Sequence, residues 1–188
     1  TTLFLILFGT ILIFLTEYSH SMNALNVFEK LQLSYFQSVT TRTAGFMTTD
    51  ITMFHPSTIM ICLILMIIGA SPVSTGGGIK TTTFALILIS FWNIIKSSFR
   101  FDFLKKTIDS QSVFIAFATL FIAVFLIFGF SFFLFLTDVA PIDKLLFEVV
   151  SAFGTVGLSL GVTPDLSTIG KLIIMITMFI GRIGPFVF

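Results

Sequence analysis

The sequence predicts an all-α polytopic membrane protein, because its composition is that of a chain surrounded mainly by lipid. Hydrophobic residues make up 56% of the 188 residues, 26 residues are Phe, and only 10% are charged, against roughly 25% charged residues in an average soluble domain. The mean hydropathy is +1.10, and the apolar residues form long blocks instead of amphipathic stripes. A soluble domain of this size is therefore excluded.

The apolar blocks define the expected membrane spans in chain order. We expect apolar spans at residues 1–16, 58–68, 83–95, 110–137 and 169–188. The first block has no basic region or cleavage site ahead of it, so it reads as a truncated span and not as a signal peptide. The clearest span is the fourth, which carries no charge in 28 residues. Residues 17–55 are too polar to cross lipid unaided.

The charges predict the orientation of the chain in the membrane. Basic residues cluster in the connection at residues 97–109 and just before it: Lys96, Arg100, Lys105 and Lys106. Short loops rich in Lys and Arg face the cytoplasm, so we place this connection there and expect a multi-pass protein of the cell membrane. The outer connections carry an excess of acidic residues, which would draw cations to that face. With a net charge of only +1, no nucleic-acid partner is expected.

A weak internal repeat divides the chain into two halves with one plan. Sliding the sequence by 112 positions, as from Ser38 to Val150, aligns residues 38–46 with 150–158 and residues 69–72 with 181–184. In each half, a short helix (residues 27–41 and 142–153) too short to cross a bilayer precedes a Thr-x-Gly turn. The alternative, which spacing alone leaves open, is that both regions are outer loops with incidental glycines.

The Thr-x-Gly turns have a physical use at membrane depth. Non-helical backbone is tolerated there only where protein or an aqueous cavity satisfies its carbonyl groups. A half-spanning helix that ends in such a turn aims carbonyl oxygens at a central axis, where they can replace the hydration shell of a cation. The negative C-terminal end of the helix dipole also favours a cation.

Four stretches together resemble the Trk/Ktr/HKT superfamily of potassium transporters, most closely the KtrB-type membrane subunit. They are residues 38–46 (SVTTRTAGF), 69–83 (GASPVSTGGGIKTTT), 151–158 (SAFGTVGL) and 181–185 (GRIGP). In that superfamily four span–pore-helix–span units surround one pore. The resemblance implies that residues 1–96 are the third unit, with an intramembrane loop at 70–78, and that residues 110–188 are a truncated fourth unit. Val73 and Met47 depart from the usual pattern, which puts only local details in doubt.

The resemblance also implies the roles of individual residues. Two of four strands of a K⁺ selectivity filter would be formed, mainly through backbone oxygens, by Thr43, Ala44, Gly45, Thr155, Val156 and Gly157. Gly76, Gly77 and Gly78 would unwind the intramembrane loop and make it a hinged gate, and Arg182 would place a positive charge in the same region of the pore. Expected partners are the missing N-terminal half of the pore, a second copy in a homodimer, a cytoplasmic nucleotide-binding regulatory ring and the lipid bilayer.

The same residues allow other interpretations: a different transporter, an assembly subunit or an enzyme. Within transport, a sodium-permeable or sodium-coupled member of the superfamily is the alternative, and a non-conducting assembly subunit is a second. An enzyme is not expected, because Ser71 and Ser74 have no matching base in the spans, and K⁺ is expected as the transported ion with no covalent cofactor. Residues 76–81 (GGGIKT) lack the Gly before Lys that a phosphate-binding loop requires.

Several polar residues stand alone in the sequence, without neighbours that would complete a functional site. His20 and His55 lack metal-ligand spacing, so we expect interfacial side chains. For Glu148 a structural role is preferred over attraction of cations. Arg182 could instead snorkel to the interface. Lys80 is either a pore-side charge or the cytoplasmic cap of the broken helix, and the cap is the preferred interpretation. Cys62 is the single cysteine, so a disulfide framework is excluded.

Overall fold

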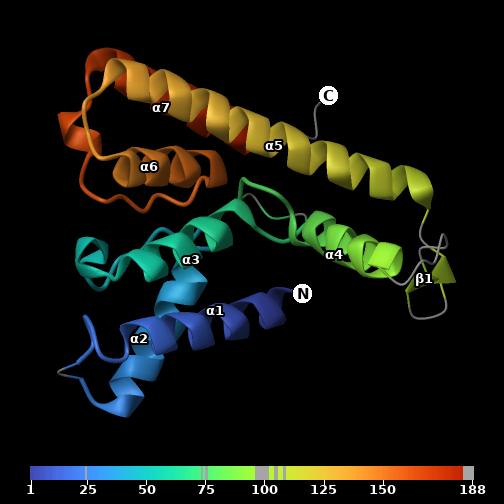
Figure 1. Cartoon of the computed structure of the whole chain (residues 1–188), viewed down its shortest axis with the longest axis horizontal. Coiled ribbons are helices and arrows are strands. Elements are labelled where there is room, and N and C mark those ends of the chain that lie inside the picture. Colours follow the sequence, from blue (N-terminus) through green and yellow to red (C-terminus); the bar gives the residue numbers. More distant parts are fainter. Residues whose placement is uncertain are drawn as a thin grey trace.

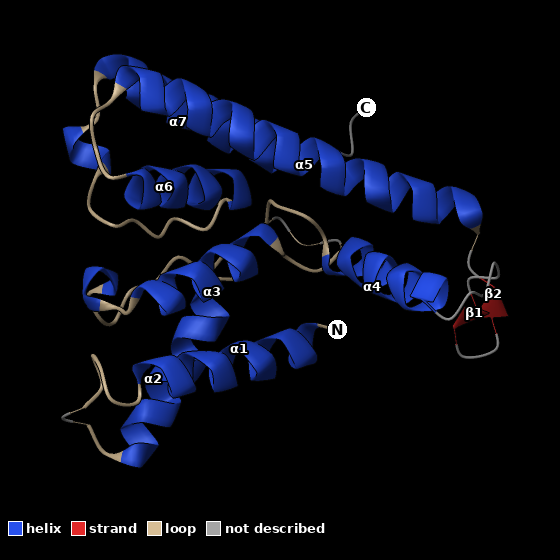
Figure 2. Ribbon diagram, in the orientation of Figure 1, coloured by secondary structure: helices blue, strands red, loops and turns tan. Residues whose placement is uncertain are grey.

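The computed structural model describes residues 1–23, 25–72, 74, 76–95 and 109–183, together with the backbone of residues 102, 103, 106 and 107. The described residues form the following α-helices in chain order: α1 (Thr2–Glu17), α2 (Val27–Thr40), α3 (Pro56–Ile67), α4 (Thr81–Ile95), α5 (Ser110–Thr137), α6 (Ile142–Gly154) and α7 (Thr168–Ile183). Two short 3₁₀ turns, η1 (Ile51–Met53) and η2 (Thr163–Asp165), precede α3 and α7. The all-α prediction is confirmed (Figure 2).

The helix bounds follow the sequence pattern closely. The predicted span at 110–137 matches the residues of α5, and the short helices expected at 27–41 and 142–153 are α2 and α6. One detail was not expected: strands β1 (Asp102–Phe103) and β2 (Lys106–Thr107) pair antiparallel in the connection that we assign to the cytoplasm. Most of that connection, 97–109, lies outside the described residues, as do Lys96, Arg100, Lys105 and residues 184–188 of the last predicted span.

Three helices of each half pack together, and the halves meet along α3 and α6 (Figure 1). In the first half α1 packs on both α2 and α3, and in the second α5 packs on both α6 and α7. The loop after α3 leads into α4, which lies against the beginning of the long α5 (Figure 1). The two 3₁₀ turns begin at Ile51 and Thr163, so they are 112 positions apart, the offset of the sequence repeat.

The surface of α5 is suited to lipid. Its 28 residues would span about 42 Å as a straight helix, more than the roughly 30 Å of a bilayer's hydrocarbon core. Of the described helices it is the one that is both long and apolar enough to be a membrane span on those criteria alone, and α1, α3 and α4 are apolar but shorter. Phe side chains stand exposed along its length, for example Phe114, Phe121, Phe125 and Phe128.

Small residues allow the helices of each half to approach closely. A Cβ added to Gly9 of α1 would come within 2.5 Å of the Ser38 hydroxyl on α2. In the second half, a Cβ on Gly181 of α7 would collide with the Phe153 carbonyl at the end of α6. Where the halves meet, a Cβ on Gly154 would lie 2.7 Å from the Met66 carbonyl of α3. The end of α6 therefore packs against α3 and α7 through backbone atoms, and the end of α2 packs against α1 through the Ser38 side chain.

A buried carboxylate connects α1 to α3 in the first half. Glu17, the last residue of α1, has no exposed surface. Its carboxylate accepts hydrogen bonds from the Ser21 backbone and hydroxyl, at 3.3 and 2.6 Å, and from the His55 N–H and the Thr58 hydroxyl, at 2.8 and 2.5 Å. His55 is the N-cap of α3, so the one carboxylate fixes the end of α1 to the start of α3.

The second half uses Asp138 for the same connection. Asp138 follows the last residue of α5 and accepts hydrogen bonds from the Ser167 N–H at 2.5 Å and the Ser167 hydroxyl at 3.1 Å, directly before α7 begins. Burial by itself raises the pKa of this carboxyl, but the hydrogen bonds from Ser167 and Thr137 and the charge of Lys171 outweigh it, so the pKa lies below its ordinary value. His55 and Ser167 are again 112 positions apart.

The Glu17 arrangement predicts a large effect of removing its carboxylate. Glu17→Ala removes the acceptor of the buried Thr58 hydroxyl and of the part-buried donors of Ser21 and His55, and each buried group left unsatisfied costs about 1–3 kcal/mol in folding free energy. We expect a clearly lower thermal unfolding temperature of the full-length protein in detergent. Asp143→Ala, an exposed acidic residue in the first turn of α6, is the matched control and should change it little. Equal unfolding temperatures for the two variants would contradict the role given to Glu17.

Candidate functional site

The two Thr-x-Gly turns have the same backbone conformation. Thr43 and Thr155 have φ angles of +66° and +53°, and Gly45 and Gly157 have φ angles of +73° and +90°. The residue between them in each turn has negative φ, since no other described non-glycine residue has positive φ. A threonine in the left-handed region is uncommon, so its occurrence at both corresponding positions is a property of the site and not of chance.

The turns converge where the two halves meet. Gly45 lies so close to the second turn that a Cβ on it would collide with the Val156 carbonyl oxygen. A Cβ on Gly157 would in turn lie 3.9 Å from the Gly45 Cα. The side chain of Thr40, at the end of α2, holds the exit of the first turn by donating to the Phe46 carbonyl at 2.6 Å. The structure therefore brings together the residues predicted as filter positions, with no side chain between the two glycines.

The glycine-rich segment between α3 and α4 is a loop closed at its base. Ile68 and Ile79 form an isolated parallel bridge, and the Ile79 N–H donates to the Ile67 carbonyl at 3.0 Å. Gly69 lies against Gly77 there, since a Cβ on Gly69 would collide with the Gly77 carbonyl. The described residues of this loop are 68–72, 74 and 76–80.

The loop contacts the threonine of each turn. The Gly77 N–H donates to the Thr155 hydroxyl at 2.7 Å, and a Cβ on Gly76 would come within 2.6 Å of the Thr43 hydroxyl. The sequence interpretation gave these glycines the role of unwinding a helix. In the structure Gly76 and Gly77 lie so close to the threonines that a side chain would not fit at either position. Of the three glycines, only Gly78 has a positive φ, +74°, and so needs the conformational freedom of glycine.

Two basic side chains hold the loop carbonyls. Lys80 Nζ donates to the carbonyls of Gly76 at 2.7 Å and Ser74 at 3.3 Å, so its side chain binds the loop in the break between α3 and α4. Arg42, directly before the first turn, donates through Nη2 to the Gly69 carbonyl at 3.3 Å. Sequence reasoning missed Arg42, because its partner is 27 residues away and no pattern links the two.

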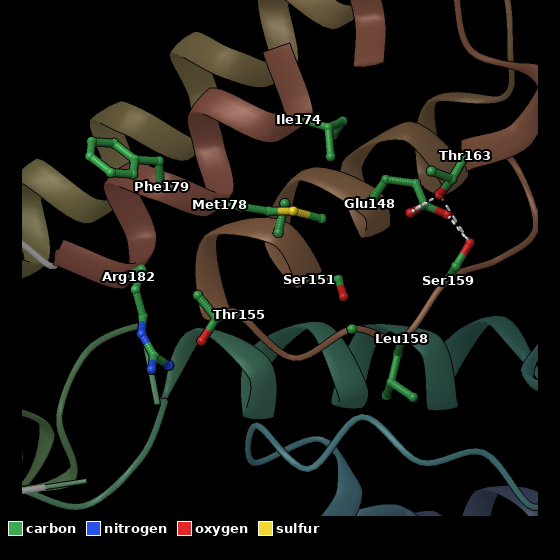
Figure 3. A pocket seen from close by; sticks show the side chains of 12 residues that line it. Glu148, Ser151, Thr155, Leu158, Ser159, Thr163, Ile174, Met178, Phe179 and Arg182 are labelled. Atoms are coloured by element: carbon green, nitrogen blue, oxygen red, sulfur yellow. Dashed lines mark hydrogen bonds between the residues drawn. The ribbon is translucent and has the colours of Figure 1, made fainter. Parts of the chain in front are cut away.

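Arg182 lines a cavity of about 600 Å³ beside the second turn. The cavity lies between α6, the segment that follows it and α7, and its lining includes Thr155, Gly157, Met178 and Phe179. The Arg182 side chain is exposed and extends from α7 beside Thr155 toward the chain that joins α3 and α4 (Figure 3). It lies near enough to Lys80 for the two positive charges to repel each other.

Glu148 shapes the chain that leaves the second turn. Its carboxylate accepts from the Ser159 hydroxyl at 2.5 Å and the Thr163 hydroxyl at 2.8 Å (Figure 3). It also accepts from the Leu160 N–H at 3.1 Å. The side chain is 5% exposed. These bonds agree with the structural role preferred from the sequence.

Several of the acidic residues that the sequence predicts on the outer face accept hydrogen bonds within the chain. Five of its acids accept hydrogen bonds within the chain: Glu17, Glu29, Asp50, Asp138 and Glu148. Asp50 caps η1, and hydrogen bonds from the Thr52 hydroxyl and N–H lower its pKa. Much of the acidic excess therefore also positions the chain, while these carboxylates keep their negative charge.

The fold and these turns define a class of protein: a polytopic helical membrane protein in which two short helices each lead into a Thr-x-Gly turn. A solved structure described as the potassium transporter TrkH from Vibrio parahaemolyticus matches with a TM-score of 0.82 at 19% identity, over 96% of this chain and 40% of that one. At this identity the match shows the fold alone.

Sequence comparison identifies the family. The model of the TrkH family, described as cation transport proteins, matches residues 2–187, and the chain belongs to this family. It is 44% identical over 184 residues to the Ktr system potassium uptake protein D of Bacillus subtilis (strain 168), and 42% identical over 189 residues to that organism's Ktr system potassium uptake protein B. Those matches cover 98% and 100% of this chain but 41% and 42% of the two relatives. The chain thus spans about two fifths of their length.

The contact between loop and turn can be tested by hydrogen exchange. Thr155→Val removes the acceptor of the Gly77 N–H, so the peptide that contains residues 76–80 should exchange faster, while α6 stays protected. Thr119→Val is the matched control, because the Thr119 hydroxyl donates only within α5, to the Ile115 carbonyl. Unchanged exchange of the loop in Thr155→Val would show that this hydrogen bond does not hold it.

Proposed function

We propose that this chain forms two of the four units of a potassium-translocating pore in the cell membrane. The observation that carries the proposal is the pair of Thr-x-Gly turns, which share one unusual conformation, face each other and rest on one glycine-rich loop. The family's description as cation transport proteins and the potassium uptake named for both Bacillus relatives support potassium as the ion.

Conduction would depend on backbone oxygens. In a chain whose φ angles alternate in sign, neighbouring peptide planes can turn their carbonyl oxygens to one side, where they take the place of the water around K⁺. Thr43 to Gly45 and Thr155 to Gly157 would supply two of four such strands. The half-spanning helices α2 and α6 end directly before them, so the negative ends of their dipoles add to the attraction.

The glycine-rich loop would be the gate. It lies against the threonine of each proposed strand, and the only regular secondary-structure contact at its base is one bridge between Ile68 and Ile79 among the residues that the structure describes. Movement of Gly76 to Gly78 away from the threonines would open the path, and Arg182 would oppose the passage of a cation nearby.

The complete transporter would contain parts beyond this chain. Residues 1–96 would be the third unit, with the loop at 70–78, and residues 110–188 the fourth, with the other two units supplied by the rest of the protein. The connection at 97–109 would face the cytoplasm and, with other inner segments, contact a nucleotide-binding regulatory ring. A homodimer in the lipid bilayer is the proposed assembly.

The filter assignment predicts a steric effect at Gly45 that a control glycine does not share. Gly45→Ala places a methyl group against the Val156 carbonyl, so we expect potassium uptake by the full-length protein to fall at least tenfold. In Gly161→Ala the backbone strain is similar, since φ is +82°, but the space is open, and uptake should stay within about twofold. Equal uptake by the two variants would overturn the filter assignment, and faster sodium than potassium uptake by the unmodified protein would favour the sodium-permeable alternative.

The gate assignment predicts a gain of flux at Arg182. Arg182→Gln removes the positive charge near the loop, so potassium uptake should rise several-fold at low external potassium. Lys171→Gln is the matched control, because Lys171 lies near the other end of α7 and donates to the Pro164 carbonyl. Uptake that is unchanged in Arg182→Gln would assign Arg182 to the interface instead of the pore.

A further inference from the structure

Helix α2 has two polar anchors on α1, one near each of its ends. Its extensive helix contacts within the described residues are with α1, whereas α6 packs on α3, α5 and α7 (Figure 1). Large apolar side chains on the rest of its surface are exposed, among them Phe28, Leu31 and Tyr35. Within this chain, the position of α2 therefore depends on its attachment to α1.

Lys30 is the anchor at the beginning of α2. It is only 5% exposed, and its Nζ donates to the Tyr18 carbonyl at 2.8 Å and lies 3.9 Å from the centroid of the Tyr18 ring. The face of an aromatic ring attracts a cation, so Tyr18 stabilises the ammonium group both through its carbonyl and through its ring. The dipole of α2 by itself disfavours a cation in the first turn, so the contact with the end of α1 accounts for a lysine here.

Ser38 is the anchor near the end of α2. Its side chain has no exposed surface, and its hydroxyl donates to the Ile6 carbonyl of α1 at 2.8 Å. Gly9 makes room for this contact, because a Cβ there would lie 2.5 Å from the Ser38 hydroxyl and 2.8 Å from the Leu65 side chain of α3. Helices α1, α2 and α3 therefore meet at this hydrogen bond.

The two anchors fix the depth and the tilt of α2, and backbone hydrogen bonds transmit that position to the first Thr-x-Gly turn. Lys30 and Ser38 are eight positions apart, which is about 12 Å along a helix axis. The Ala44 and Gly45 N–H groups donate to the Thr40 carbonyl at 3.2 and 3.3 Å, so the turn is bonded to the last residue of α2. A shift of α2 on α1 would therefore shift the turn with it.

The corresponding positions of the second half carry no such anchors. Ile142 and Val150 stand 112 positions after Lys30 and Ser38, and neither side chain can donate a hydrogen bond. Helix α6 is instead enclosed by packing, since all of residues 147–154 are buried. The polar anchors thus hold the short helix that has the fewer packing partners within this chain.

We propose that Lys30 and Ser38 are positioning residues of the proposed filter, because they set where the carbonyl oxygens of the first turn stand relative to those of the second. This role rests on the pore proposed above, and its measurable consequence is selectivity. A filter built from carbonyl oxygens selects an ion by the way these oxygens surround it. The two residues control the preference for potassium over sodium without touching the ion.

The test is the ratio of potassium to sodium uptake into liposomes that contain the purified full-length protein. Ser38→Ala removes the hydroxyl and leaves the Cβ, and Lys30→Met removes the charge and keeps a long side chain, so we expect each to lower the ratio at least fivefold. Ser34→Ala is the matched control, because Ser34 is equally buried on α2 but donates to the Lys30 carbonyl of its own helix at 2.8 Å. Its ratio should stay within twofold of that of the unmodified protein.

Two further variants separate positioning from general packing at Lys30. Lys30→Arg retains a donor and a cation for Tyr18, and Tyr18→Phe retains the carbonyl and the ring face, so both should keep the ratio within twofold. A ratio in Lys30→Arg as low as that in Lys30→Met would overturn the role of Lys30. Ratios unchanged in Ser38→Ala and Lys30→Met, or lowered equally in Ser34→Ala, would overturn the proposal as a whole.

Hydrogen exchange tests the Ser38 anchor without transport. In Ser38→Ala the amides of Ala44 and Gly45 should exchange faster, while the second turn exchanges as in the unmodified protein. Unchanged exchange of the first turn would overturn the anchor. If the unmodified protein takes up no potassium, the proposed pore fails, whereas this measurement still decides whether Ser38 holds α2 in place.

Discussion

Irregular backbone inside a membrane must find partners within the protein, and the arrangement of this chain follows from that constraint. Two turns and one loop leave helical geometry at the centre of the structure, and part of their polar groups bond within the protein. The Thr155 hydroxyl accepts from the loop, while Lys80 and Arg42 donate to its carbonyls. Glycine at the contact points lets these segments approach closely enough for such bonds to form. The helices around them supply the apolar surface toward lipid.

Carboxylates fix the ends of the helices at the side that we predict to face outward. Glu17 and Asp138 are not 112 positions apart, so they do not correspond in the repeat. Each nevertheless accepts a hydrogen bond from the backbone N–H of the residue directly before a helix: His55 before α3 and Ser167 before α7. The two halves thus reach one tertiary connection from different sequence positions. A backbone N–H can be paired with a carboxylate from more than one position in the chain. The two halves can therefore share one architecture although few of their residues are identical.

Much of the architecture could be predicted from the sequence, because apolar blocks and short polar-flanked helices report directly on lipid contact. The spans, both short helices and the two turns follow from local pattern. The contacts that define the site could not be predicted in this way. These contacts depend on tertiary packing between segments that are distant in the sequence, and hydrophobic periodicity carries no information about such packing. Examples are the hydrogen bond from Arg42 to the Gly69 carbonyl, the contact of the loop with Thr155 and the ring contact of His20 with His55. Nor could the sequence show that five of the acidic residues also accept hydrogen bonds within the chain.

The described residues of the two halves differ after the helix that follows each 3₁₀ turn. Helix α3 stops at Ile67 and gives way to the loop, whereas α7 continues past the corresponding position, Phe179, to Ile183 at the end of the described residues. Within the described residues, the loop is contributed by the first half. Closure in the proposed pore would act as a one-sided flap against a fixed seat and not as a symmetric iris. A stimulus would then need to displace only a single segment of about a dozen residues, without rearranging the surrounding helices.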